Sequence, residues 1–136
     1  MLSVSEICEI AGVTRKTLFH YDQIGLLKPS ARIGKQKIKM YDRNARNCLL
    51  EIRLYRFVGM PIELIRKIVQ GNSGSREAVL QQYLMELKQE RDQLEQKIRT
   101  ADSLRRITEA EFQNILNSSA GIEQLKQMIL ERYERR

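Results

Sequence analysis

A stripe of apolar residues with heptad spacing runs through the second half of the chain and constrains its fold more than any other feature. The intervals between its members alternate between four and three residues. That spacing places side chains along the face of a helix that pairs with another helix in a coiled coil. The stripe consists of Leu80, Leu84, Leu87, Arg91, Leu94, Ile98 and Ala101, in which Arg91 is the polar break.

A helix over residues 75–110 would be about 50 Å long at about 1.5 Å per residue. The residues before it are too few to cover the whole stripe, so we expect the helix to pair, most economically with a second copy of the chain. The pair is a parallel or an antiparallel coiled coil, and every member of the stripe except Arg91 belongs to the predicted dimer interface. The alternative is a helix that folds back on its own head.

Positive charge is concentrated in the first half of the chain. Residues 1–70 contain 13 Lys and Arg against 6 Asp and Glu, whereas residues 71–136 contain 11 of each kind, so the whole net charge of +7 lies in the first half. A one-sided basic excess is typical of proteins that bind nucleic acids. The alternative is surface charge that only keeps the protein soluble.

Two short helices are predicted at the N-terminus. Ser3 and Glu6 have the capping-box pattern that opens the first helix, and Gly12 ends it. The inward face of this helix carries Val4, Ile7, Cys8 and Ala11. Thr14 caps a second helix over about residues 15–24, whose inward residues are Leu18, Tyr21 and Ile24.

Two helices joined by a short turn that contains glycine are typical of a helix-turn-helix. In that motif the second helix enters the major groove of DNA and presents its N-terminal residues to base edges. Arg and Lys pair with guanine or phosphate, and Thr donates to phosphate. The residues at this position are Thr14, Arg15, Lys16 and Thr17.

A basic hairpin is predicted next. Lys35, Lys37 and Lys39 alternate with other residues, which favours a strand with one basic face, and Gly34 stands where a hairpin would turn. Residues 28–46 contain seven basic residues and one acidic residue. A hairpin of this kind beside a recognition helix is a wing. The alternative is an edge strand whose lysines prevent aggregation.

The remaining elements are predicted to be helical. A helix from residue 42 to about 58 has as its inward residues Ala45, Leu49, Ile52, Leu54 and Tyr55. Pro61 opens another helix, with Ile62, Ile65, Ile68 and Val69. Residues 71–75 form a linker. A tail helix carries Phe112, Ile115 and Leu116, and the last helix has as its inward residues Ile122, Leu125, Met128, Ile129 and Tyr133.

The fold expected is therefore mainly α. A winged helix-turn-helix domain over residues 1–71 precedes a dimerisation helix over residues 75–110 and a helical tail over residues 111–136. We expect the tail to pack on the dimer core, with an effector-sensing role as the alternative.

Several classes of function are excluded. With one histidine, His20, and no nucleophile paired with a base, the chain is not expected to be an enzyme. Cys8 and Cys48 lie 40 residues apart within apolar patterns, so we interpret them as buried hydrophobic residues rather than redox or metal-binding groups. No cofactor or metal is expected. No apolar run approaches about 18 residues, so no membrane partner is expected and the cytoplasm is the expected location.

Three separated segments resemble the MerR family of bacterial transcription regulators. The segments are residues 17–29 (TLFHYDQIGLLKP), 39–41 (KMY) and 57–65 (FVGMPIELI). With the long helix, the resemblance covers residues 1 to about 110 in order.

The resemblance implies a homodimer that binds double-stranded DNA at a pseudo-palindromic promoter, with its two heads set by an antiparallel coiled coil. Such regulators act with RNA polymerase by bending and untwisting the promoter spacer, which makes DNA shape part of recognition. The DNA-binding residues then expected are Thr14, Arg15, Lys16, Thr17, Phe19, His20, Tyr21, Arg32, Lys35, Lys37, Lys39 and Tyr41.

The sequence departs from that family at two places. Phe19 stands where the family usually has Arg, so it makes no charged contact, and a thymine methyl group is the alternative partner. Lys37-Ile38-Lys39 stands where the family usually has Gly-Tyr-Arg, and Lys39 keeps the charge without the bidentate fork of Arg. For His20, a contact with the DNA backbone and a purely structural role both remain open.

The sequence identifies no effector. No cysteine follows Cys48, which argues against a mercury, copper or superoxide sensor. The large ligand domain of the multidrug-sensing members is not expected after the long helix. Two other functions compete with the regulator. One is an architectural or excisionase-like protein that bends DNA, which the long helix argues against, and the other is a coiled-coil interaction module whose basic head is incidental.

Overall fold

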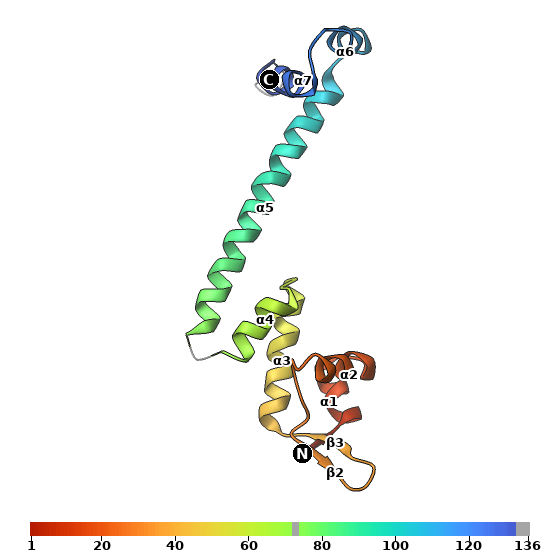
Figure 1. Cartoon of the computed structure of the whole chain (residues 1–136), viewed down its shortest axis with the longest axis vertical. Helices are drawn as coiled ribbons and strands as arrows, with labels where there is room; N and C mark the ends of the chain where they lie inside the picture. The colour runs from red at the N-terminus through yellow and green to blue at the C-terminus, as the bar shows by residue number, and fades with distance from the viewer. Residues whose placement is uncertain (72–73, 133–136) are drawn as a thin grey trace. The chain divides into compact units, whose positions relative to one another are not determined.

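The computed structural model describes residues 1–71 and 74–132, which form two compact units, Met1–Tyr83 and Leu84–Arg136 (Figure 1). The elements in chain order are β1 (Leu2–Ser3), α1 (Val4–Ala11), α2 (Arg15–Gln23), β2 (Ala31–Ile33), β3 (Ile38–Tyr41), α3 (Arg43–Phe57), α4 (Ile62–Val69), α5 (Ser75–Arg106), α6 (Glu109–Leu116) and α7 (Ile122–Arg132).

The first two helices begin where the sequence predicts. The Ser3 hydroxyl accepts a hydrogen bond from the Glu6 amide, and the Glu6 carboxylate accepts one from the Ser3 amide, both at 3.2 Å. Gly12 ends α1 in the left-handed conformation, at φ 66°, which glycine adopts without a steric penalty. Thr14 caps α2 by accepting from the Thr17 amide at 3.1 Å. These caps fix the turn between the two helices.

A three-stranded antiparallel sheet in the order β1-β3-β2 supports the wing. Strand β1 was not predicted, because two residues are too few to show an alternating pattern. Leu2 pairs with Tyr41, and Ser3 with Met40. The prediction of a strand with lysines along one face is wrong for residues 34–37, which form the turn of the hairpin. Gly34 and Lys37 both adopt positive φ there, at 78° and 51°. The turn therefore carries Lys35 and Lys37 to the tip of the wing.

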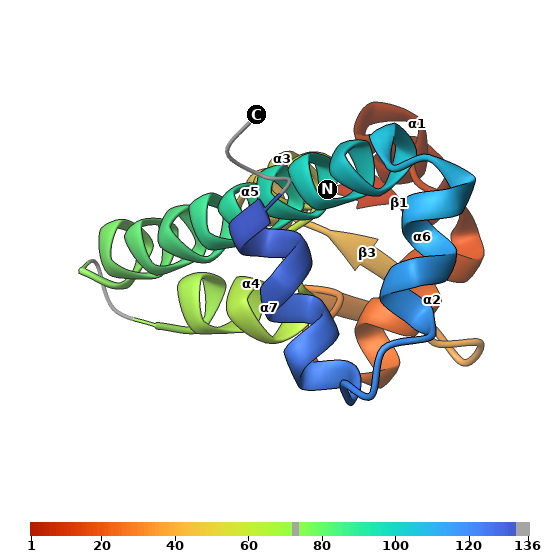
Figure 2. The ribbon, with the colours of Figure 1, turned by 90° about the horizontal axis from the view of Figure 1, so that it is seen from above.

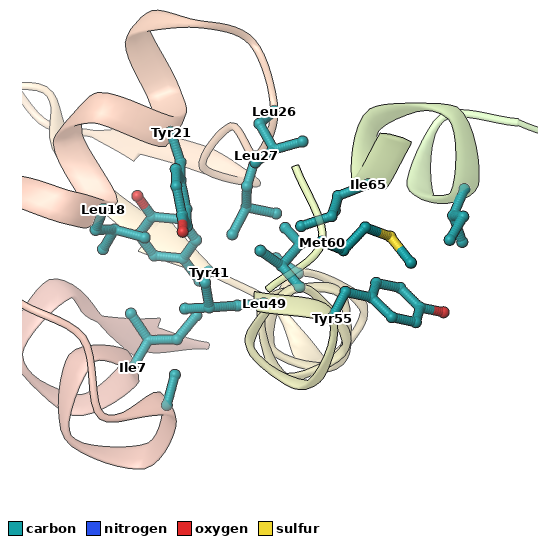
Figure 3. Packing of buried hydrophobic residues seen from close by; sticks show 14 of the residues in the cluster. Ile7, Leu18, Tyr21, Leu26, Leu27, Tyr41, Leu49, Tyr55, Met60 and Ile65 are labelled. Carbon is teal, nitrogen blue, oxygen red and sulfur yellow. The ribbon is translucent and has the colours of Figure 1, made fainter. Parts of the chain in front are cut away.

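One hydrophobic core joins the helices and the sheet of the first unit (Figure 3). Its largest fully buried side chains come from α1, α2, β3, α3, the turn after α3, and α4, and they are Ile7, Leu18, Tyr41, Leu49, Ile52, Met60 and Ile65. Leu54 was predicted to face this core, but 68% of it is exposed. At 3.6 residues per turn it lies on the opposite side of α3 from Ile52.

The start of α5 belongs to the first unit by its packing. Val79 and Tyr83 are buried in the core of the head, and the Tyr83 hydroxyl donates to the Val58 carbonyl at 2.8 Å. Arg76 forms an ion pair with Glu51 on α3 at 2.7 Å. The compact head thus extends beyond the boundary at residue 71 that the sequence suggests, and the linker expected at residues 71–75 lies partly outside the described residues.

The second unit contains the rest of α5 and the two tail helices (Figures 1 and 2). The helix α5 ends at Arg106, and Thr108 caps α6 by accepting from the Glu111 amide at 3.2 Å. A small core forms there from Ile107, Phe112, Ile115 and Leu125. Ile122, predicted to face inward, is exposed, and Tyr133 lies outside the described residues.

Tyr41 differs from its predicted place on the DNA-binding surface. Its exposed fraction is 0%, and it lies among Ile7, Leu18, Tyr21 and Leu49 (Figure 3). Its buried hydroxyl has no hydrogen-bond partner among the described residues. Burial, and next the negative charge of Asp22, raise the pKa of Tyr41 to about 12, so the hydroxyl stays neutral. The assignment of Tyr41 to DNA contact is corrected, because a fully buried side chain offers DNA no surface.

We predict that Tyr41→Phe raises the free energy of unfolding by about 1 kcal/mol, because it removes a hydroxyl whose desolvation no hydrogen bond repays. Tyr55→Phe is the matched control. The Tyr55 hydroxyl donates to Glu51 at 2.6 Å, so its removal should lower stability. Urea denaturation at one protein concentration measures the free energy of unfolding of both variants and of the wild type. A Tyr41→Phe variant that is less stable than the wild type would contradict the prediction.

Candidate nucleic-acid interface

One face of α2 is exposed and polar, and the opposite face is buried. Leu18 and Tyr21 face the core, and the spacing of the helix leaves the other side to solvent. The exposed residues of that side that were predicted to bind DNA are Arg15, Lys16, Phe19 and His20. This face is the part of the predicted recognition helix that a nucleic acid can reach. Tyr21 is 6% exposed, so it belongs to the buried side of α2 and not to this face.

Several polar side chains in the first turn of α2 form hydrogen bonds within the head. The Thr14 and Thr17 hydroxyl oxygens lie 3.0 Å apart, in addition to the cap that Thr14 makes. Arg15 donates a hydrogen bond to the Ser5 hydroxyl on α1. Thr14 is thus chiefly a capping residue, whereas Lys16 projects from an exposed position beside it.

The two strands of the wing place two cations side by side. Arg32 on β2 is the direct cross-strand partner of Lys39 on β3. Like charges in directly opposed positions of an antiparallel pair repel each other and destabilise the sheet. A counter-charge near both cations therefore offsets this repulsion.

Asp22 on α2 supplies that counter-charge. Its carboxylate lies 2.8 Å from Lys39 Nζ and 3.1 Å from Arg32 Nη2, and Lys28 Nζ approaches to 3.7 Å. The residue is only 6% exposed. Burial raises its pKa, but hydrogen bonds from Lys39 and then Arg32, together with their charges, outweigh that effect and leave the pKa below its ordinary value. Asp22 is therefore ionised at neutral pH and ties the wing to α2.

The Phe19 ring lies beside one member of this ion cluster, Lys39. The Lys39 ammonium is 4.9 Å from the centre of the Phe19 ring, within the range of a cation–π interaction. Phe19 is 55% exposed. It therefore contacts Lys39 within the head, a contact that was not predicted, and still presents ring surface to solvent.

The structure divides the predicted DNA-binding residues into three groups. Arg15, Lys16, Phe19 and His20 on α2, and Lys35 and Lys37 on the wing turn, are exposed. The second group makes polar contacts within the head: Thr14 and Thr17 take part in the cap, and Arg32 and Lys39 pair with Asp22, although Thr14 and Arg32 are also exposed. Tyr21 and Tyr41 belong to the core.

Asp22 is the functional candidate that the sequence analysis missed. A signal was present, because it is the one acidic residue between Glu9 and Asp42 in a strongly basic segment. Several cations near such an acidic residue could pair with it. The sequence does not indicate which of them do so, because the partners lie on other elements of the fold.

The described residues hold no group of three or more His, Cys, Asp and Glu side chains that could bind a metal ion. Burial raises the pKa of the Cys8 and Cys48 thiols. A raised pKa keeps a thiol protonated and less nucleophilic. Among the described residues, every helix is too short or too polar to cross a membrane.

We predict that Asp22→Asn destabilises the head by about 1–2 kcal/mol, less than the loss of a fully buried ion pair, because Arg32 and Lys28 reach solvent. Since the folded-state pKa of Asp22 is lowered, this stabilisation is present above its ordinary pKa of 3.8 and is lost as the pH falls through the lower folded-state value. The difference between variant and wild type should stay constant from pH 7 to about pH 5. Urea denaturation at several pH values measures this difference in the free energy of unfolding. Equal stability of the variant and the wild type at pH 7 would disprove a stabilising role for the ion pairs of Asp22 with Arg32 and Lys39, which we call the Asp22 clamp.

The model of the MerR HTH family regulatory protein matches residues 2–72. The HTH-type transcriptional activator mta of Bacillus subtilis is 33% identical over 98 residues, which are 70% of this chain and 38% of that protein. The nodulation protein NolA of Bradyrhizobium elkanii is 37% identical over 70 residues, which are 52% of this chain and 32% of that protein. The chain therefore spans about a third of the length of these curated relatives.

Solved structures agree with this similarity. The N-terminal part of the multidrug transporter activator of Bacillus subtilis, MtaN, superimposes with a TM-score of 0.59 at 32% identity, covering 72% of this chain and 94% of that chain. The lead-bound regulator PbrR691 of Ralstonia metallidurans superimposes with a TM-score of 0.67 at 20% identity, covering 94% of this chain and 99% of that chain, and supports the fold alone. The resemblance seen in the sequence is confirmed, and the chain belongs to the MerR family of helix-turn-helix regulatory proteins.

Proposed function

We propose that the protein is a homodimeric transcription regulator that binds a promoter through the exposed face of α2 and the tip of the wing. The observation that carries this proposal is the position of the exposed cations. Lys16 lies on α2, and Lys35 and Lys37 lie on the turn of the wing, all on a family head whose net charge is strongly positive.

The two surfaces have different chemistry in this proposal. The start of α2 offers Arg15 and Lys16 to base edges and phosphates of the major groove, and its N-terminal amides attract a phosphate. The turn of the wing offers Lys35 and Lys37, whose flexible ammonium groups suit phosphate rather than base recognition. Arg32 and Lys39 hold the wing in place through Asp22, so they contribute chiefly to its position.

An unpartnered seam on α5 supports the homodimer. Leu84, Leu94 and Ile98 are more than half exposed in the single chain, at 51%, 59% and 59%. Their removal from water favours association by roughly 25 cal/mol for each Å² buried. The heptad spacing matches the face that a second α5 covers.

Arg91 favours the antiparallel arrangement of that pair. In a parallel pair in register, Arg91 would face its own copy across the seam, where two like charges repel. In an antiparallel pair centred between residues 92 and 93, Leu84 faces Ala101, Leu87 faces Ile98, and Arg91 faces Leu94. The guanidinium then lies against an apolar side chain and keeps its ion pair with Asp92, at 3.1 Å.

The remaining parts of the proposal follow from family membership. An antiparallel pair separates two heads that each read half of a pseudo-palindromic site, and binding bends and untwists the spacer between them for RNA polymerase. A regulator of this kind acts in the bacterial cytoplasm. Selection of bound fragments from genomic DNA, followed by footprinting, tests the proposal. Protection of a promoter spacer supports it, and scattered protection without a preferred site contradicts it.

We predict that Lys16→Ala weakens binding to the selected site about tenfold, because a side chain of the α2 face is lost while the buried core is untouched. Lys88→Ala on α5 removes the same charge outside the head and serves as the control. Fluorescence anisotropy at several salt concentrations measures both, with a salt slope smaller by about 0.9 for the Lys16 variant if the contact is to phosphate. Equal affinity of the Lys16 variant and the wild type would remove α2 from the interface.

We predict that Leu87→Asp raises the dimer dissociation constant at least about 100-fold, because an unpaired carboxylate would be buried in an apolar seam. Gln89→Asp introduces the same charge on the outer side of the same helix and should leave the dimer intact. Sedimentation velocity over a range of concentrations measures both variants. A Leu87→Asp protein that sediments as the wild-type dimer would disprove the coiled coil.

A further inference from the structure

Phe19 places a large apolar side chain on the polar face of α2. Phe19 is 55% exposed, and it is not among the described side chains that form or border the core of the head. Arg15 and Lys16 lie four and three residues before it on the same helix, and both are exposed. Leu18 and Tyr21, in contrast, point into the core (Figure 3). The aromatic ring of Phe19 therefore belongs to the surface proposed to read DNA and not to the core.

The ring of Phe19 is held at one place on this surface. The Lys39 ammonium lies over the ring, 4.9 Å from its centre, and the same ammonium lies 2.8 Å from the Asp22 carboxylate. Asp22 is 6% exposed and stands three residues after Phe19 on α2. A side chain that is already held in position loses less conformational entropy when it binds a partner. Phe19 is thus a preorganised apolar contact, with the rest of its ring surface exposed to solvent.

The base edges of the major groove offer an aromatic ring one kind of apolar partner. Guanine, adenine and cytosine present hydrogen-bond donors and acceptors there, whereas thymine also presents its C5-methyl group. A ring that covers a donor or an acceptor removes water from it without supplying a hydrogen bond, which costs free energy. The phosphates are no better as partners, because the face of an aromatic ring carries partial negative charge. The thymine methyl group is therefore the feature of the groove that matches Phe19.

We propose that Phe19 contacts the C5-methyl group of a thymine and so selects a thymine–adenine pair at one position of each half-site. This inference rests on the proposed function, in which the exposed face of α2 enters the major groove. Arg15 and Lys16 then supply charge and hydrogen bonds, whereas Phe19 discriminates between bases through a methyl group alone. Because the proposed dimer is two-fold symmetric, the same position is selected in both half-sites.

Replacement of thymine by uracil tests the contact. The full chain is titrated with the duplex selected from genomic DNA, and each thymine of a half-site is replaced in turn by 2′-deoxyuridine, which keeps every hydrogen-bonding group and loses only the methyl group. Fluorescence anisotropy measures each dissociation constant. At one position the replacement should raise the dissociation constant about fourfold, as expected for one buried methyl group. A wild-type protein that binds every uracil duplex as tightly as the thymine duplex overturns the proposal.

A double-mutant cycle assigns the methyl contact to Phe19. Phe19→Ala should bind the thymine duplex and the uracil duplex with equal affinity, because the ring that distinguishes them is gone. His20→Ala removes the neighbouring exposed side chain and should keep the preference for thymine, whatever its overall affinity. A Phe19→Ala variant that keeps this preference overturns the proposal, since another residue would then contact the methyl group.

The cycle also distinguishes a DNA contact from a role of the ring inside the head. If Phe19 acted only by contacting Lys39 and so positioning the wing, Phe19→Ala would weaken binding to the thymine duplex and to the uracil duplex by the same factor. A methyl contact predicts a larger loss of affinity for the thymine duplex. Equal losses for the two duplexes therefore overturn the proposal. Phe19 lies outside the core, so the variant should fold, and circular dichroism checks that it does.

Failure of this inference is distinguishable from failure of the proposed function. Selection that yields no preferred site, or equal affinity of Lys16→Ala and the wild type for a selected site, contradicts the role of α2 in reading DNA. A selected site that Lys16→Ala binds more weakly, but at which uracil replaces every thymine without loss of affinity, leaves the regulator in place and overturns the role of Phe19. A selected half-site that contains no thymine has the same consequence.

Discussion

The carboxylate of Asp22 decides how the two parts of the proposed DNA-binding surface are placed relative to each other. The wing is a short hairpin that reaches the core through Tyr41 at the end of β3, and its strands bring Arg32 and Lys39 into direct opposition. Without a counter-charge this register would be unfavourable. Asp22 provides the counter-charge from α2, so a residue of the proposed recognition helix holds the wing in place.

Because of the Asp22 clamp, a positively charged residue of this head is not necessarily available to contact DNA. Cations that are close in sequence have different environments: Lys35 and Lys37 are exposed on the turn, whereas Lys39 lies between Asp22 and the ring of Phe19. Phe19 contacts the Lys39 ammonium with its ring and remains 55% exposed.

The helix α5 carries an apolar surface that a single chain does not cover. The head covers the apolar side chains of the first two turns of α5, where Val79 and Tyr83 are buried. Beyond them Leu84, Leu94 and Ile98 of the stripe stay exposed. These surfaces cost free energy in the monomer in proportion to their apolar area. In the proposed dimer, the α5 helix of a second copy covers this stripe.

The sequence by itself determined the helices, their caps and the family, because those features depend on neighbours within a few residues. The Ser3–Glu6 capping box, the end of α1 at Gly12 and the start of α2 at Thr14 are local hydrogen-bond patterns. Only the tertiary structure decided that Tyr41 is buried and that Leu54 is exposed. It also decided that Arg32 and Lys39 face Asp22, and that the head extends to Tyr83. The reason is physical: burial and ion pairing depend on elements far apart in the chain, and a pattern of period two or 3.6 indicates a face without indicating what the fold places against it.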